Sequence, residues 1–155
     1  MSENSVIKIH DLHFSYGSPV ILEDIQLDIK AKEFVGMVGP NGSGKTTLLK
    51  IILGLLDPGK GSVEVLGKQP HQAVKEIGYM PQFTPFSRDF PINVEETVLM
   101  GRLGRTSSIG LFSKEDKQLA AESMEAVEVL DLRKRSIGSL SGGQLQRVLI
   151  ARALT

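Results

Sequence analysis

Alternating apolar and polar residues open the chain and predict two half-buried β-strands, over residues 6–12 and 20–29. The continuous apolar run from Phe34 to Val38 is typical of a strand buried on both faces. Apolar residues then recur at helical spacing over 46–56, and two further short strands are predicted over 62–67 and 77–82. The first half of the chain therefore predicts an α/β unit.

The pattern changes after Gln82. A loop with two prolines over 83–91 leads to a predicted helix over 93–102 and a Gly/Ser-rich loop over 106–111. Ser113 and Asp116 are typical of a helix start, which predicts a helix from there to about residue 130. A last helix is predicted over 144–154. We expect a β subdomain with the nucleotide-binding core over 1–82, a helical subdomain over 83–139 and a final segment over 140–155.

Composition narrows the function classes. The 155 residues carry 18 basic and 18 acidic side chains, and this zero net charge argues against a general nucleic-acid binder. The chain has no cysteine, which excludes disulfides and thiolate metal sites. No signal-peptide pattern occurs at the start, and no run approaches the roughly 18 apolar residues of a membrane span. We expect no direct membrane insertion, so any work at a membrane would go through a partner.

Residues 39–46 read Gly-Pro-Asn-Gly-Ser-Gly-Lys-Thr and match the phosphate-binding P-loop, between a predicted strand and a predicted helix. The glycines allow backbone N–H groups to face phosphate oxygens, and the helix N-terminus adds partial positive charge. Lys45 can approach the β- and γ-phosphates, and the Thr46 hydroxyl can ligate Mg²⁺. The motif alone fits ATPases, GTPases and kinases. The predicted ligand residues are Gly39, Pro40, Asn41, Gly42, Ser43, Gly44, Lys45, Thr46 and Thr47.

A second glycine-rich motif, the signature segment, occupies residues 140–144 as Leu-Ser-Gly-Gly-Gln. A serine hydroxyl and exposed N–H groups at a helix start form another anion-binding end. Because it follows a P-loop at residues 39–46 in the same chain, the segment at 140–144 resembles the signature sequence of ABC-type ATPases. The resemblance covers residues 6–155. It implies an α/β P-loop NTPase of the ABC type, truncated, with an N-terminal antiparallel β subdomain and a helical insert subdomain.

The resemblance also implies roles for single residues. Tyr16 lies where the family stacks an aromatic ring on adenine, although an ordinary sheet-surface tyrosine is the alternative. Gln82 lies where the family has its Q-loop glutamine, which reaches Mg²⁺ and the attacking water, and the alternative is a solvated loop amide. ATP on one copy would be covered in trans by a second copy, giving a homodimer across ATP. The covering residues would be Ser141, Gly142, Gly143 and Gln144.

The sequence ends at Thr155, before the strand that in the family ends in Asp-Glu. No catalytic residue is therefore assigned within this chain, beyond a sensing role for Gln82. We expect ATP hydrolysis only in a longer parent and little or none in the isolated chain. Because an apolar strand over 34–38 needs neighbours, we also expect a marginal or self-associating fold.

Residues 90–102 resemble the corresponding stretch of ATPases that serve zinc, manganese or iron-type metal importers. The resemblance implies contact with an integral membrane permease through the helical subdomain, and a cytoplasmic, peripheral location at the inner face of the cell membrane. The transported substrate would be a metal ion, although no metal-ligand cluster occurs in the sequence. A soluble ABC ATPase without a transport role and a non-catalytic ATP-binding fragment are the alternatives.

Overall fold

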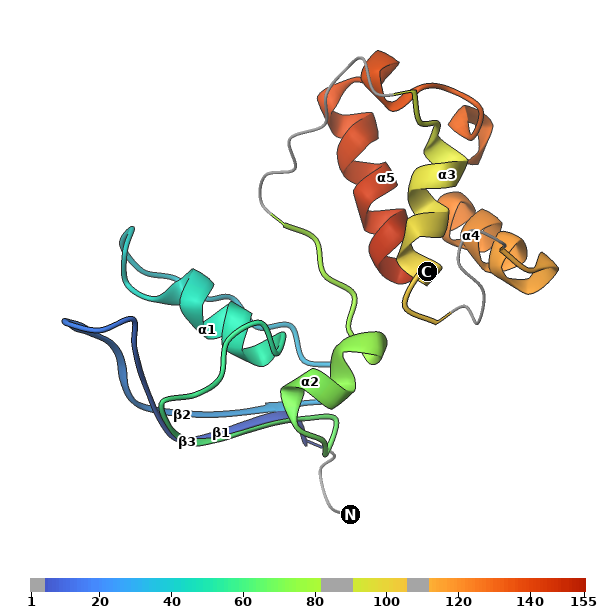
Figure 1. Cartoon of the computed structure of the whole chain (residues 1–155). Helices are drawn as coiled ribbons and strands as arrows, with labels where there is room; N and C mark the ends of the chain where they lie inside the picture. The colour runs from blue at the N-terminus through green and yellow to red at the C-terminus, as the bar shows by residue number, and fades with distance from the viewer. Residues whose placement is uncertain (1–4, 82–90, 106–111) are drawn as a thin grey trace. The chain divides into compact units, whose positions relative to one another are not determined.

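The computed structural model describes residues 5–81, 91–105 and 112–155, which belong to two compact units, Met1–Glu76 and Ile77–Thr155 (Figure 1). The units divide between Glu76 and Ile77, ahead of the subdomain boundary that the sequence places at Gln82. The finer division into 1–82, 83–139 and 140–155 stays a prediction.

The first unit is built on an antiparallel sheet of three strands in the order β2-β1-β3. The strands are β1 (Ser5–Ser15), β2 (Val20–Lys30) and β3 (Lys60–Val65), which confirms the strands predicted over 6–12, 20–29 and 62–67. In the central strand, Ile9 is opposite Leu27 on one side and Val63 on the other. Positive φ angles of 46° at Asp11 and 51° at Asp24 accompany irregular register in this pairing.

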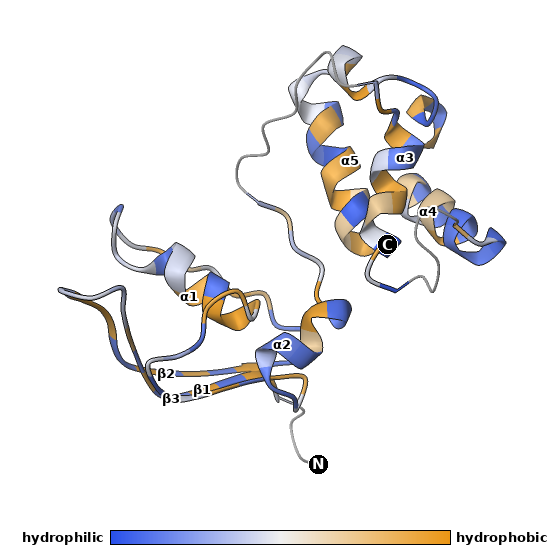
Figure 2. Cartoon of the chain, in the orientation of Figure 1, coloured by the Kyte–Doolittle hydropathy of each residue, from blue (hydrophilic) through white to orange (hydrophobic). Residues whose placement is uncertain are grey.

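Helix α1 (Lys45–Ile52) adds its buried side to the core of this unit. The helix ends four residues before the predicted end at residue 56, because Gly54 has a φ of +67° that terminates it. A Cβ on Gly54 would lie 2.7 Å from the His71 backbone nitrogen, so the turn packs closely on α2 (Pro70–Ala73), which η1 (Val74–Glu76) continues. Figure 2 shows apolar residues along the strands and α1. The buried apolar residues here are Ile9, Leu12, Leu22, Leu48, Ile51, Ile52, Val63, Val65 and Ala73.

The strands predicted over 34–38 and 77–82 are wrong for the residues that the structure describes. Residues 34–38 lie in an irregular segment in which Phe34 is 100% and Val38 is 96% exposed. Residues 77–81 likewise form no strand. A strand exists only with a hydrogen-bonded neighbour, and the sheet pairings join β1 with β2 and β1 with β3. Residues 34–38 are apolar, as a buried strand would be, but no partner strand for them occurs within the described residues.

The second unit is helical. It contains α3 (Val94–Leu99), η2 (Met100–Arg102), α4 (Lys114–Ala126), η3 (Leu130–Leu132), η4 (Ile137–Ser139) and α5 (Gly142–Leu154). The three α-helices contact one another pairwise, and Figure 1 shows α3 beside α5. These elements confirm the helices predicted over 93–102 and 144–154. The helix predicted from 113 to about 130 starts as expected but ends at Ala126, ahead of Glu128, whose φ of 57° does not continue a helix. The shared core consists of Val94, Val98, Leu99, Ala120, Met124, Val129, Leu132, Val148 and Ala151.

Each of these α-helices begins with a capping box, in which the N-cap side chain and the N3 side chain each bond the other's backbone N–H. The pairs are Asn93 with Glu96, Ser113 with Asp116, and Ser141 with Gln144. The predicted cap at Ser113 is confirmed, with its Oγ 3.1 Å from the Asp116 nitrogen. A cap of this kind contributes about 1 kcal/mol, so the starting residue of each helix is well defined.

Close packing at Gly61 yields a test of the first unit. Gly61 has a φ of +89°, and a Cβ there would lie 2.2 Å from the Asp11 carbonyl oxygen. Gly67 has a φ of +72°, with no atom within 4 Å of its Cβ position. We expect Gly67→Ala to cost about 1 kcal/mol of unfolding free energy from backbone strain alone. Gly61→Ala should cost at least about 2 kcal/mol more, measured by urea denaturation; equal losses in the two variants would contradict the packing described.

Asp116 yields a test of the second unit. The hydrogen bond from Arg102 Nε, followed by those from Ser113, holds the pKa of this carboxyl below its ordinary value. Because the folded pKa lies below the unfolded one, the ionised carboxylate stabilises the fold above about pH 3.9. That stabilisation is lost as the pH falls through the folded pKa.

We therefore expect Asp116→Asn to lower the free energy of unfolding at pH 7, with a difference from wild type that disappears under acid. The measurement is urea denaturation followed by circular dichroism across pH 2.5–7. Glu115→Gln removes an exposed carboxylate from the same first turn of α4 and should change the curve by at most about 1 kcal/mol, through the helix dipole alone. A pH-independent difference for Asp116→Asn would contradict the role of its charge.

Candidate functional site

The phosphate loop, residues 39–46, runs directly into α1. Gly42 and Gly44 have φ angles of +82° and +85°, a region that L side chains rarely adopt. Gly44 is the N-cap of α1, no side chain caps this end, and the first turn contains no acidic residue. The amino end of α1 thus keeps its N–H groups and its partial positive charge available for an anion.

Lys45 places its ammonium group within the loop. Its Nζ donates to the carbonyl oxygens of Gly39 at 2.8 Å and Pro40 at 2.6 Å, and lies 3.4 Å from Ser43 Oγ. These acceptors hold the charge beside the loop backbone. A phosphate bound to the loop N–H groups would therefore meet this cation.

The two threonines that follow differ in exposure. Thr46 is exposed, so its hydroxyl is accessible to a metal ion held by phosphate oxygens. Thr47 is only 8% exposed and belongs to the buried side of α1. Of the two predicted ligand residues, Thr47 could therefore contribute its backbone N–H rather than its hydroxyl.

Strand β2 fixes the end of the phosphate loop. A Cβ on Gly44 would lie 2.7 Å from Leu22 Cδ2 and 3.2 Å from the Ile21 carbonyl oxygen, so only glycine allows this approach. Leu22 is 5% exposed and cannot move away without opening the core. The phosphate-loop motif does not point to Leu22, because it does not reveal which strand the loop packs on.

Tyr16 is connected to this loop through the sheet. Its side chain is 62% exposed, and its ring packs edge-on against Phe14 with 4.9 Å between ring centroids. Phe14 is opposite Leu22 in the pairing of β1 with β2, and Leu22 contacts the Gly44 position. Figure 1 draws the β1–β2 turn and the loop before α1 at the same end of the unit. An exposed aromatic ring on this part of the sheet can stack on a base.

The signature segment lies at the start of α5 in the other unit. Ser141 is the N-cap, its Oγ accepts from the Gln144 nitrogen at 3.3 Å, and its own N–H donates to Gln144 Oε1 at 3.0 Å. Gly142 and Gly143 are exposed, with no atom within 4 Å of either Cβ position. The glycines thus present open backbone to solvent, whereas the Gln144 side chain is already engaged in the cap.

The predicted site residues fall in different parts of the chain. The phosphate loop and Tyr16 belong to the first unit and the signature segment to the second. Gln82 lies outside the described residues, so its proposed contact with Mg²⁺ stays a prediction. Across the described ranges, no group of three or more His, Cys, Asp or Glu residues could hold a metal ion.

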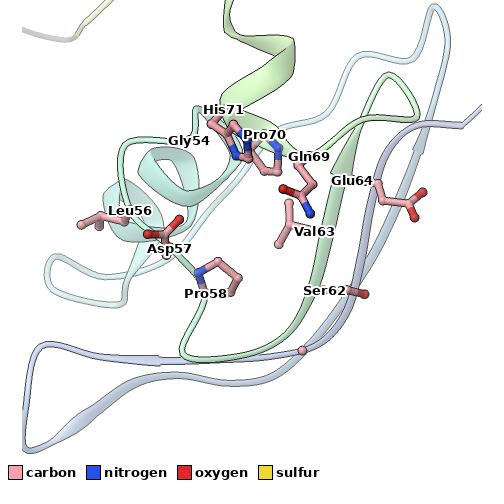
Figure 3. Close-up of a pocket in the computed structure, with 11 residues that line it drawn as sticks. Gly54, Leu56, Asp57, Pro58, Ser62, Val63, Glu64, Gln69, Pro70 and His71 are labelled. Atoms are coloured by element: carbon pink, nitrogen blue, oxygen red, sulfur yellow. The ribbon is translucent and has the colours of Figure 1, made fainter.

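A cavity of about 330 Å³ occurs elsewhere in the first unit, between the end of α1, β3 and the start of α2 (Figure 3). Its lining includes Asp57, Gln69 and His71 beside the apolar Pro58 and Val63. No phosphate-loop residue lines it. The cavity is therefore separate from the candidate site.

A family model and curated relatives match most of the chain. A family model described as ABC transporter matches residues 22–155. The manganese transport system ATP-binding protein MntB of Halalkalibacterium halodurans is 42% identical over 151 residues, covering 97% of this chain and 60% of that protein. The high-affinity zinc uptake system ATP-binding protein ZnuC of Bacillus subtilis is 38% identical over 151 residues, covering 97% and 65%. The chain thus spans about three fifths of the length of these curated relatives.

Solved structures share the fold. A structure of an ABC transporter in an inward-facing conformation has a TM-score of 0.82 and 33% identity, covering 97% of this chain and 55% of that one. The ADP conformation of an ATP-binding cassette of an ABC transporter also has a TM-score of 0.82, at 25% identity, covering 97% and 64%. These likenesses confirm the predicted fold class. Among the helices in the described part of the chain, none is long and apolar enough to cross a bilayer.

The contact between Gly44 and β2 predicts how the loop responds to a single added methyl group. Gly44→Ala should weaken MgATP binding at least tenfold, because the new Cβ would displace the loop from Leu22. Leu22→Val removes the colliding Cδ2 atom, so the double variant should recover part of the affinity. The measurement is titration with a fluorescent ATP analogue. Gly67→Ala, an equally left-handed glycine without neighbours, serves as the control; unchanged affinity in Gly44→Ala would contradict this packing.

Proposed function

The chain belongs to the ABC transporter family, and we propose that it is the ATP-binding part of an importer subunit that energises uptake of a metal ion. The observation that carries the proposal is the phosphate loop. The amino end of α1 has no side-chain cap there, and the Lys45 ammonium lies beside the loop backbone. The similarity to ATP-binding proteins of manganese transport and zinc uptake systems supports a metal ion as the substrate.

The described residues fit ATP with Mg²⁺. The loop N–H groups and Lys45 would hold the β- and γ-phosphates, with Gly39, Gly42 and Gly44 allowing the backbone to approach them. Thr46 would ligate Mg²⁺, and the ion would neutralise phosphate charge when bound. Tyr16 would stack on adenine, because its ring is exposed and braced by Phe14. Gln82 would add the second protein contact to the metal.

The second half of the site would come from another copy of the chain. The open backbone of Gly142 and Gly143 and the Ser141 hydroxyl stand at the amino end of a 13-residue helix, which suits an anion. A chain with a phosphate loop and a signature segment can complete two such sites in a symmetric homodimer. The Gln144 side chain would contact the nucleotide only by giving up the hydrogen bond that it accepts from the Ser141 nitrogen.

Coupling to transport would go through the helical unit, which we propose contacts an integral membrane permease. The subunit would then be cytoplasmic and peripheral at the inner face of the membrane. In this arrangement the transported metal is the cargo of the permease. The ATP-binding part therefore needs no metal-ligand cluster of its own.

The nucleotide proposal is tested at two lysines of the same helix. Lys45→Ala should weaken ATP binding by about 10- to 100-fold, which corresponds to about 1.4–2.7 kcal/mol. Lys50→Ala removes an exposed lysine from the last turn of α1 and should leave the affinity unchanged. Calorimetric titration with MgATP gives both dissociation constants.

Equal affinities for wild type and Lys45→Ala would overturn the proposed site. A matching loss in Lys50→Ala would show a general charge effect instead of a contact made by Lys45. Circular dichroism on all samples would establish that the variants keep their helical content.

A further inference from the structure

We propose that Phe14 is a positioning residue for the nucleotide base, because its ring holds the exposed ring of Tyr16 in the orientation that receives the base. The inference rests on the proposed function, in which Tyr16 stacks on adenine. It adds that the contribution of the base to affinity depends on a second aromatic residue, which would not touch the base itself. Phe14 is half-buried and belongs to the paired part of the sheet.

Tyr16 lies outside the part of the sheet that strand pairing holds. Strand β1 ends at Ser15, which is opposite Val20, and residues 16–19 connect it to β2. The Tyr16 side chain is 62% exposed, and exposed side chains exchange among their staggered rotamers within nanoseconds. A base would therefore meet a mobile ring unless another group restricts it.

The backbone at Phe14, in contrast, is held from both neighbouring strands. Phe14 is opposite Leu22 in β2, and Leu22 is 5% exposed. On the other side, the Gly59 nitrogen donates to the His13 carbonyl oxygen at 3.0 Å, just before β3 begins. A Cβ on Gly59 would lie 3.1 Å from that oxygen and 3.8 Å from Phe14 Cα, so the chain packs closely there. Phe14 therefore has little freedom to move.

The two rings meet in a geometry that leaves room for a base. Their centroids are 4.9 Å apart and their planes lie at 88° to each other, which is the edge-to-face arrangement that aromatic pairs favour. A perpendicular neighbour covers at most one face of the Tyr16 ring, so the other face stays open. The contact thus restricts the tyrosine side chain without occupying the surface on which a base would stack.

The same contact places the tyrosine ring on the side of the sheet where the phosphate loop ends. Residues opposite each other in paired strands present their side chains on one face. Phe14 therefore shares a face with Leu22, whose Cδ2 would lie 2.7 Å from a Cβ on Gly44. Tyr16 follows Phe14 by two residues, the spacing at which side chains share a face. The base and the phosphates of one nucleotide would therefore meet the same side of the sheet.

Order in the ring before binding sets the size of the expected effect. An edge-to-face aromatic pair changes an equilibrium constant by about 2- to 10-fold beyond the area that it buries. Confinement of the Tyr16 side chain to one of its three χ1 wells accounts for up to about threefold of this. The phosphate loop gains nothing from an ordered tyrosine. Replacement of Phe14 should therefore lower only the part of the affinity that depends on the base.

The test compares MgATP with magnesium tripolyphosphate, which has the phosphate groups without the base. Calorimetric titration should show that Phe14→Leu weakens ATP binding about three- to tenfold and tripolyphosphate binding by less than about twofold. Tyr16→Ala should show the same split. Phe14→Tyr keeps a ring at this position and should bind both ligands as wild type does. Phe34→Leu, which removes a fully exposed phenylalanine from the same unit, should also match wild type.

A spectroscopic measurement reports on the ring without any ligand. Three-bond NMR couplings give the χ1 populations of Tyr16, and cross-relaxation between the two rings reports their contact. We expect one dominant Tyr16 rotamer in wild type and in Phe14→Tyr, and averaged couplings in Phe14→Leu. Loss of general stability alone would not produce this pattern in a folded variant.

Unchanged Tyr16 couplings in Phe14→Leu, or equal losses of ATP and tripolyphosphate affinity in that variant, would overturn the inference. If Tyr16→Ala weakens ATP binding but Phe14→Leu does not, the inference alone fails. If Tyr16→Ala binds ATP as wild type does, stacking on adenine fails and the positioning role with it. If Phe14→Leu does not fold, Phe14→Met decides by the same two measurements.

Discussion

The contact on which the first unit depends is the approach of Gly44 to strand β2. A backbone with a φ of +85° lies where a single Cβ would collide with Leu22. The contact sets the direction in which α1 leaves the sheet, and the same Leu22 is opposite Phe14, against which Tyr16 packs. Placement of the phosphate groups and of the base would therefore both be set by one buried leucine. The motif supplies the chemistry of the loop, and the sheet supplies its position.

In the helical unit, a charged pair helps to position the helices. Its apolar core brings α3, α4 and α5 together, and each helix starts at a defined residue because of its capping box. A directional contact is added between η2 and α4, where Arg102 Nε donates to Asp116 Oδ1 at 2.8 Å. Buried ion pairs contribute uncertainly to stability, but they can select one arrangement among several of similar burial. The pair of Arg102 with Asp116, whose side chains are largely buried, is well placed for that role.

How much of this was predictable from sequence depends on how local the information is. The β1, β2 and β3 strands, the Ser113–Asp116 cap and the phosphate loop follow from neighbouring residues, and the structure contains each. The prediction of a strand over 34–38 was wrong, because an apolar run forms a buried strand only when other strands or helices cover it. The run itself does not reveal whether such partners are present. Leu22 and Arg102 could not be found in this way. Arg102 contacts Asp116, 14 positions away on another helix, and no spacing rule for a single strand or helix relates the two.

The hydrogen bonds of Lys45 have a consequence for ligand selectivity. Its ammonium already has acceptors in the carbonyl oxygens of Gly39 and Pro40, so the rotamer entropy of the side chain, about 2 kcal/mol, is lost largely on folding. A ligand must compete with these oxygens for the cation. A phosphate chain with several negative charges can do so, whereas an uncharged nucleoside has only its ring to offer to Tyr16. The loop would thus select among nucleosides and nucleotides by their number of phosphate groups, independently of any contact with the base.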